Sequence, residues 1–122
     1  MKSNLFILFL LLCFFTGCKD AVVQPNDYPL LITKEVTKIN AYGATFQADV
    51  IVQGSDKIVD YGFVWNTGST DYKLSLLGVT DLKNFKTVIM SNWKANQLYS
   101  CKAYIQTTNH LVYGNRVQFI YP

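Results

Sequence analysis

A strict alternation of apolar and polar residues in three segments is the feature that most limits how this chain can fold. Apolar side chains recur at every second position from Ala44 to Val52, from Val59 to Trp65 and from Tyr99 to Ile105. A period of two is typical of a β-strand with one buried face, and no stretch shows sustained helical periodicity. The sequence therefore predicts three half-buried strands, with Trp65 and also Trp93 in the core.

Weaker strand signals surround these three segments. They begin near Leu30 and continue at residues 72–79, 84–90 and 111–121. Gly, Asn, Asp and Ser separate the segments at intervals of roughly 8 to 12 residues, which favours an antiparallel arrangement. Within the last run, Gly114-Asn115 predicts a bulge. The prediction is an all-β fold, an antiparallel β-sandwich of about seven strands over residues 30–122.

The start of the chain has the character of an export signal. A short, positively charged opening that contains Lys2 precedes an unbroken apolar run from Leu5 to Phe15. This order is typical of a secretory signal peptide. The run is too short to span a bilayer, which takes roughly 20 apolar residues.

The segment Thr16-Gly17-Cys18 closes the apolar run and resembles the lipobox of bacterial lipoproteins. The resemblance implies cleavage after Gly17, alkylation of the Cys18 thiol by a diacylglycerol and acylation of the new amino group. Two or more acyl chains hold a protein durably on a membrane, so lipid on Cys18 would tether the domain. An ordinary cysteine behind an ordinary signal peptide is the alternative.

These signals divide the chain into three parts. Residues 1–17 are predicted to be a lipoprotein signal peptide, residues 18–29 a lipid-anchored linker containing Pro25 and Pro29, and residues 30–122 the sandwich. The expected location is the cell envelope, on the outer membrane, with its periplasmic and surface faces both open. Lys19-Asp20 faintly resembles the signal that sends lipoproteins of the Bacteroidetes to the cell surface.

The segment from Trp93 to Tyr104 is similar to the fibronectin type III signature. Together with residues 61–65 and 113–119, it resembles the fibronectin III-like lipoprotein domains common in Bacteroidetes. The resemblance covers about residues 34–119. It implies that Tyr99 is the tyrosine corner, with its ring in the core and its hydroxyl bonded to the backbone just upstream. It implies an architecture and no particular activity.

The residues that could carry chemistry are few. Once Cys13 leaves and Cys18 carries lipid, Cys101 has no disulfide partner, and we expect it to be buried and inert. His110 is the only histidine, so neither a zinc site nor a Ser-His-Asp arrangement is expected. No Gly-rich phosphate loop is present. We predict no enzymatic activity, no metal and no cofactor.

The charge pattern also excludes nucleic acid as a partner. Removing Lys2 from the 11 basic residues leaves ten, against eight acidic ones, and no run of Lys or Arg forms a stripe. The leading hypothesis is an adhesion or protein-interaction module that uses a sheet edge or the loop tips at residues 66–72 and His110. The alternative is a glycan-binding accessory lipoprotein, in which Tyr72 and an exposed Tyr104 would stack on sugar rings.

Overall fold

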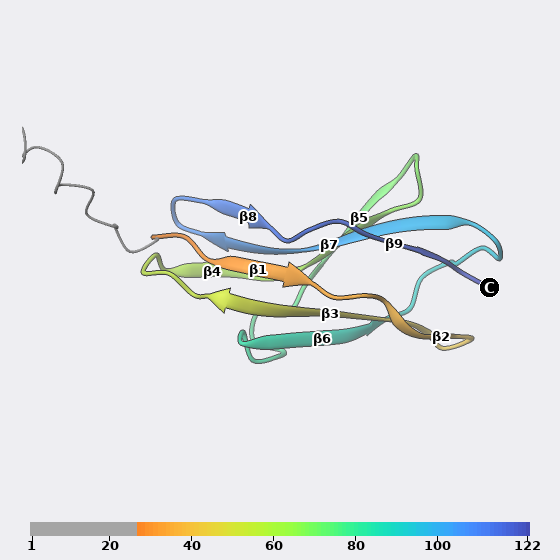
Figure 1. The fold of residues 1–122 in the computed structure, drawn as a ribbon, viewed down its shortest axis with the longest axis horizontal. Coiled ribbons are helices and arrows are strands. Elements are labelled where there is room, and N and C mark those ends of the chain that lie inside the picture. The colour runs from red at the N-terminus through yellow and green to blue at the C-terminus, as the bar shows by residue number, and fades with distance from the viewer. Residues whose placement is uncertain (1–26) are drawn as a thin grey trace, which may run out of the picture.

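Two antiparallel sheets packed face to face make up the computed structural model, which describes residues 27–122 (Figure 1). The first sheet contains β1 (Leu30–Thr33), β2 (Thr37–Asn40), β3 (Gly43–Val52) and β6 (Asn84–Ile89). The second contains β4 (Ile58–Asn66), β5 (Asp71–Ser75), β7 (Leu98–Thr107), β8 (Leu111–Tyr113) and β9 (Val117–Ile120). The predicted all-β sandwich is confirmed. The signal peptide, Cys18 and most of the linker lie outside the described residues.

Within residues 27–122 there is no helix that could cross a membrane. The nine strands occupy seven positions, because two edges are each shared by a pair of strands. β1 and β2 pair with opposite halves of β3, on the edge that faces away from β6. In the same way, β8 and β9 pair with opposite halves of β7, on the edge that faces away from β4.

Aromatic side chains from both sheets fill the core between the layers. Phe46 of β3 is fully buried and makes edge contacts with Phe63 at 5.6 Å, with Trp65 at 5.8 Å and with Phe119 at 5.7 Å between ring centroids. Trp93 is partly buried and packs against the same cluster. Such T-shaped contacts are favourable beyond the area that they bury.

The predicted alternation fails at two strand ends. Val59 was expected to face the core, but a register shift between Ile58 and Asp60 inserts an extra residue there. Ile58 packs against the core in its place, and Val59 is exposed. Val52, at the end of β3, is exposed as well. A β-bulge inserts one residue and so reverses the faces to which the following side chains point. A strict period of two in the sequence does not predict where a bulge occurs.

The predicted final strand is divided in two at Gly114-Asn115, where a side chain from the first sheet enters. Asn115 Oδ1 accepts a hydrogen bond from Thr33 N at 2.9 Å, and its Nδ2 donates to Thr33 O at 3.1 Å. The hydroxyl of Thr33 in turn accepts from Ala103 N at 2.9 Å. A Cβ on Gly114 would lie 2.5 Å from Thr33 Oγ1, so only glycine fits. We call this arrangement the Thr33–Asn115 clamp.

Tyr99 makes the contact described for a tyrosine corner. Its hydroxyl accepts a hydrogen bond from the backbone N–H of Lys94 at 2.7 Å. Its ring is 1% exposed and stacks on Phe119, with the ring centroids 5.5 Å apart. The hydrogen bond satisfies a backbone donor in the connection that leads into β7.

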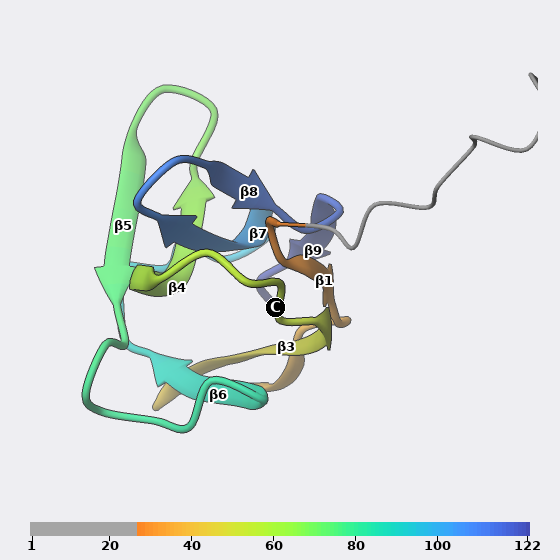
Figure 2. The ribbon, with the colours of Figure 1, turned by 90° about the vertical axis from the view of Figure 1, so that its left-hand side faces the viewer.

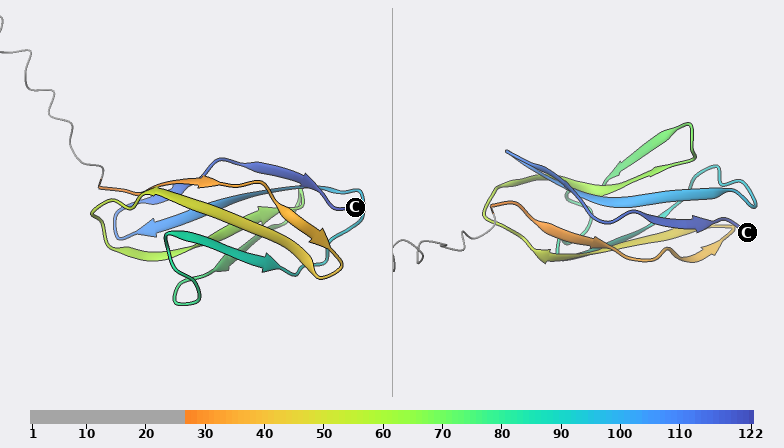
Figure 3. Two further views of the ribbon diagram at one scale, coloured as in Figure 1. Left: turned by 60° about the horizontal axis from the view of Figure 1, so that its bottom comes forward. Right: turned by 45° about the horizontal axis from the view of Figure 1, so that its top comes forward.

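The chain enters and leaves the sandwich at opposite ends of its long axis (Figures 1 and 3). Residue 27 lies beside the connection between β3 and β4, because Asp56 N donates to Asp27 O at 2.9 Å. The hairpin of β4 and β5 rises out of its sheet beyond β7, as the right-hand view of Figure 3 shows. Among the described residues, no strand lies beyond β5 in that sheet (Figure 2).

The clamp predicts a specific loss of stability. Asn115→Ala removes both side-chain hydrogen bonds to Thr33 and should lower the free energy of unfolding by about 2 kcal/mol. Asn92→Ala is the matched control, since Asn92 is exposed and outside every strand. Urea unfolding followed by tryptophan fluorescence measures both variants. Equal stabilities of the two variants would contradict the role of the clamp.

Candidate functional site

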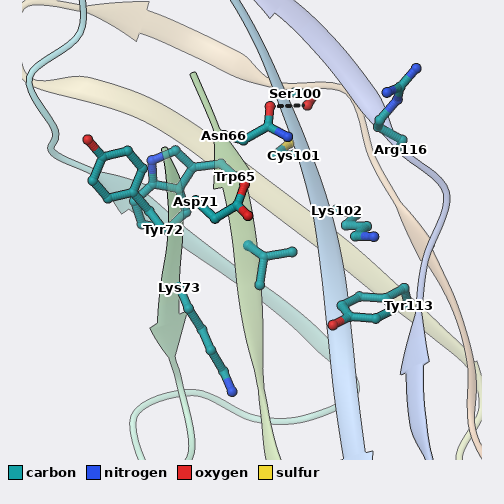
Figure 4. Close-up of a pocket in the computed structure, with 11 residues that line it drawn as sticks. Trp65, Asn66, Asp71, Tyr72, Lys73, Ser100, Cys101, Lys102, Tyr113 and Arg116 are labelled. Atoms are coloured by element: carbon teal, nitrogen blue, oxygen red, sulfur yellow. Dashed lines mark hydrogen bonds between the residues drawn. The ribbon is translucent and has the colours of Figure 1, made fainter. Parts of the chain in front are cut away.

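A hollow of about 490 Å³ lies on the outer face of the five-stranded sheet (Figure 4). β4, β5, β7, β8 and the segment between β8 and β9 contribute its lining. Stacking of Tyr72 on Trp65 joins β5 to β4 from the inner side, with ring centroids 5.6 Å apart and planes 16° apart. The raised β4–β5 hairpin is therefore held by packing beneath it, and it forms one wall of the hollow.

The strand register assembles three cations in a line across this face. Val64 pairs with Lys73 on one side and with Lys102 on the other. Val117 pairs with Cys101 and Gly114 N donates to Ala103 O, so the short segment between them, which contains Arg116, runs beside Lys102. Neighbouring strands are about 4.8 Å apart, so charges distant in sequence become close in space. We call Lys73, Lys102 and Arg116 the cationic row.

The three cations differ in their partners. Lys73 Nζ lies 3.7 Å from Asp60 Oδ2 and 4.7 Å from the centre of the Tyr104 ring. Lys102 Nζ lies 4.0 Å above the Tyr113 ring. Within residues 27–122, neither Lys102 nor Arg116 forms an ion pair. Two positive charges at the hollow are therefore without an acidic partner there.

Two residues further along these strands, toward the β4–β5 turn, the outer face is polar and carries a single acid. Ser100 Oγ donates to Asn66 Oδ1 at 2.6 Å, and Asp71 pairs with Asn66 across the strands. Asp71 lines the hollow and forms no ion pair in the described chain. The lining thus holds three cations and one carboxylate.

The prediction that Tyr104 is exposed is wrong. Tyr104 does point to the outer face, since it pairs with Gly62 and Tyr113, but its side chain is only 1% exposed. Lys73 covers its ring, and its hydroxyl donates to Asp60 Oδ2 at 2.9 Å. Burial raises the pKa of the Tyr104 phenol above its ordinary value, and the bond to Asp60 raises it further. Long neighbouring side chains bury a position that alternation alone leaves open.

Tyr72 and Tyr104 also lie on opposite faces of the sheet. Tyr72 pairs with Trp65 and stacks on it, on the inner side, whereas Tyr104 pairs with Gly62 on the outer side. Tyr72 is half-exposed at the sheet edge. The two rings cannot form one flat platform, so the stacking arrangement expected for a glycan ligand is absent from this pair.

The two predicted loop tips are at opposite ends of the molecule. Asn66 pairs with Ser100 at one end of β7, whereas the turn that contains His110 follows Thr107 at the other. His110 Nδ1 is 2.8 Å from Asp56 Oδ2, and this hydrogen bond lowers the pKa of Asp56. The two loop tips therefore do not adjoin one another, and the predicted binding surface at the loop tips or at a sheet edge stays a prediction.

Cys101 is buried, as predicted, and burial raises the pKa of its thiol to about 12. It is therefore protonated at neutral pH and is not a nucleophile, because only the thiolate attacks. No group of three or more His, Cys, Asp or Glu side chains that could hold a metal occurs in residues 27–122. What the hollow offers chemically is noncovalent binding by charged and polar groups.

Comparison with protein-family models found no match to this chain, and comparison with curated proteins found none either. The fold and the hollow define a β-sandwich with a cationic outer face. No pattern in the sequence predicts the cationic row as a whole. Lys102 alternates with Tyr99 and Cys101 and must therefore face outward, which identifies one member of the row but not its neighbours.

A hydrogen-bond network at Asp60, which also contacts Lys73 of the hollow, contributes a stability that depends on pH. Partial burial raises the pKa of Asp60, but hydrogen bonds from Ser75, Tyr104 and Tyr61 N, with the charge of Lys73, outweigh burial and lower it overall. A lowered pKa in the folded state stabilises the fold above the unfolded pKa of about 4. That stabilisation is lost as the pH falls through the folded value.

Asp60→Asn should therefore have a lower free energy of unfolding than wild type at pH 7. The difference between the two free energies should shrink as the pH falls from about 5 to 3. Asp81→Asn is the control, since Asp81 is exposed and outside every strand. Urea unfolding at each pH measures the difference. A gap between wild type and Asp60→Asn that stays constant with pH would contradict the assignment.

Proposed function

We propose that the mature chain is a lipid-anchored, non-enzymatic β-sandwich of the bacterial cell envelope that binds a protein partner through its cationic outer face. The lipobox-like Thr16-Gly17-Cys18 supports the anchor. The hydrogen bond of Tyr99 to Lys94 N and the seven strand positions support a fibronectin III-like domain of the kind common in Bacteroidetes. Sandwiches of this kind present binding surfaces on rigid sheets.

The single observation that carries the proposed binding role is the hollow with two cations that lack acidic partners. A concave, mostly pre-formed site with a few convergent polar groups is the usual form of a binding site. Lys102 and Arg116 at the hollow have no ion pair in the described chain, so their charge is available to a partner.

The position of the hollow suits a tethered domain. Residue 27 lies near Asp56, at the end of the sheet where Ile58 pairs with Thr107. The hollow is in the other half, near the pairing of Asn66 with Ser100. A membrane anchor on Cys18 would hold the first end, and the cationic face would project away from the lipid surface. The partner can then reach the face from the side.

The anchor is tested by metabolic labelling. Cells that express the full chain and are fed a labelled fatty acid should incorporate label into wild type and into Cys13→Ala, the matched control within the predicted signal. Cys18→Ala should carry none, because no thiol remains to be alkylated. Protease added to intact cells then separates the two faces of the outer membrane, since only a surface domain is removed. Label on Cys18→Ala would contradict the anchor.

The binding face is tested by crosslinking in living cells. A photo-crosslinking amino acid in place of Gln118, which pairs with Ser100 on the hollow side, should give a discrete protein adduct. The same group in place of Lys86, on the outer face of the other sheet, is the control and should give none. Equal adducts from both positions, or none from Gln118, would contradict the proposed face.

A further inference from the structure

We propose that the cationic row binds the carboxylates of a short, extended acidic segment of the partner protein. This inference deepens the proposed function and rests on the same outer face. It assigns a ligand chemistry to Lys73, Lys102 and Arg116, which no feature of the sequence marks as a site.

Unmatched charge at the hollow favours an acidic ligand. Arg116 lies in the segment that runs beside Lys102, and neither cation has an acidic partner in residues 27–122. Like charges that line one hollow repel each other, so a ligand carboxylate between them relieves repulsion as well as adding attraction. The guanidinium of Arg116 matches a carboxylate with two parallel hydrogen bonds. An acidic ligand is the complement of this arrangement.

The restraint and the spacing of the three cations suit an extended peptide. Contacts within the protein restrain two of the three cations: Lys102 lies over the Tyr113 ring, and Lys73 lies between Asp60 and the Tyr104 ring. Less side-chain freedom is then lost on binding. The row crosses four strand positions, about 14 Å at about 4.8 Å per step. An extended peptide places alternate side chains about 7 Å apart, so three acids at alternate positions span a similar length.

The surroundings of the row favour a peptide over an acidic polysaccharide. Tyr104 is buried, and Lys102 occupies one face of the ring of Tyr113, which is 44% exposed, so these two rings do not form a bare platform for a sugar. Asp71, at one end of the hollow, repels a uniform polyanion but can accept a hydrogen bond from a peptide N–H. Asn66 and Ser100 beside it offer further donors and acceptors. A short segment with a few carboxylates fits this mixture of charges.

The test uses the full lipidated chain in a zwitterionic detergent and a fluorescent Glu-Gly-Glu-Gly-Glu peptide with blocked ends, whose Gln-Gly-Gln-Gly-Gln counterpart is the uncharged control. One variant neutralises the row. It carries Lys73→Gln, Lys102→Gln and Arg116→Gln. A matched control also loses three positive charges, but at exposed positions away from the hollow. It carries Lys57→Gln, Lys83→Gln and Lys86→Gln.

Wild type should bind the acidic peptide, the row variant should bind it about tenfold more weakly, and the control should differ from wild type by less than about twofold. Binding should weaken with added salt, because the pairs are exposed. Urea unfolding checks that both variants fold.

In the peptide assay, the inference would be overturned by no binding of the acidic peptide to wild type, by equal losses in the two variants, or by equal binding of the uncharged peptide. Tighter, row-dependent binding of an oligogalacturonate would assign the face to an acidic polysaccharide and overturn it too. A crosslinked adduct from Gln118 that persists when the row is neutralised would leave the binding face intact while refuting the acidic ligand. The two proposals therefore fail separately.

Discussion

The Thr33–Asn115 clamp is the interaction on which the rest of the architecture depends. On the side of the sandwich where β1 and the β8–β9 segment form the sheet edges, each edge would expose unpaired backbone groups. Such edges invite unwanted pairing. The clamp satisfies Thr33 N and O with one amide side chain and engages Ala103 N with the Thr33 hydroxyl. It also interrupts the last strand at Gly114, which sets where β9 begins and hence where Arg116 emerges.

Two aromatic residues that suggest ligand contacts in the sequence also make structural contacts in the fold. Tyr72 supports the raised hairpin by stacking on Trp65, and Tyr104 packs beneath Lys73. Tyr99, predicted to be structural, closes the connection into β7 with one hydrogen bond. In the hollow itself, partly exposed Tyr72 and Tyr113 lie beside charged and polar side chains.

The strands could be predicted because a period of two is a local signal, present in each segment by itself. The burial of Tyr104 could not, since the side chain that covers it comes from β5, 31 positions earlier in the chain. The cationic row depends on the register between β4, β5, β7 and β9, which pairwise strand contacts determine. Scattered single charges in a sequence say little about which of them will meet on one face.

Residue 27 and the hollow lie toward opposite ends of the strands, and this placement has a mechanical consequence. A pull between residue 27 and the far half of the outer face runs parallel to the strands (Figure 1). The backbone hydrogen bonds between strands lie perpendicular to that direction, so they are loaded together in shear rather than opened one after another. The pairing of β1 with β3 and the Thr33–Asn115 clamp share this load at the first strand. The sandwich is thus oriented to resist extension along its strands.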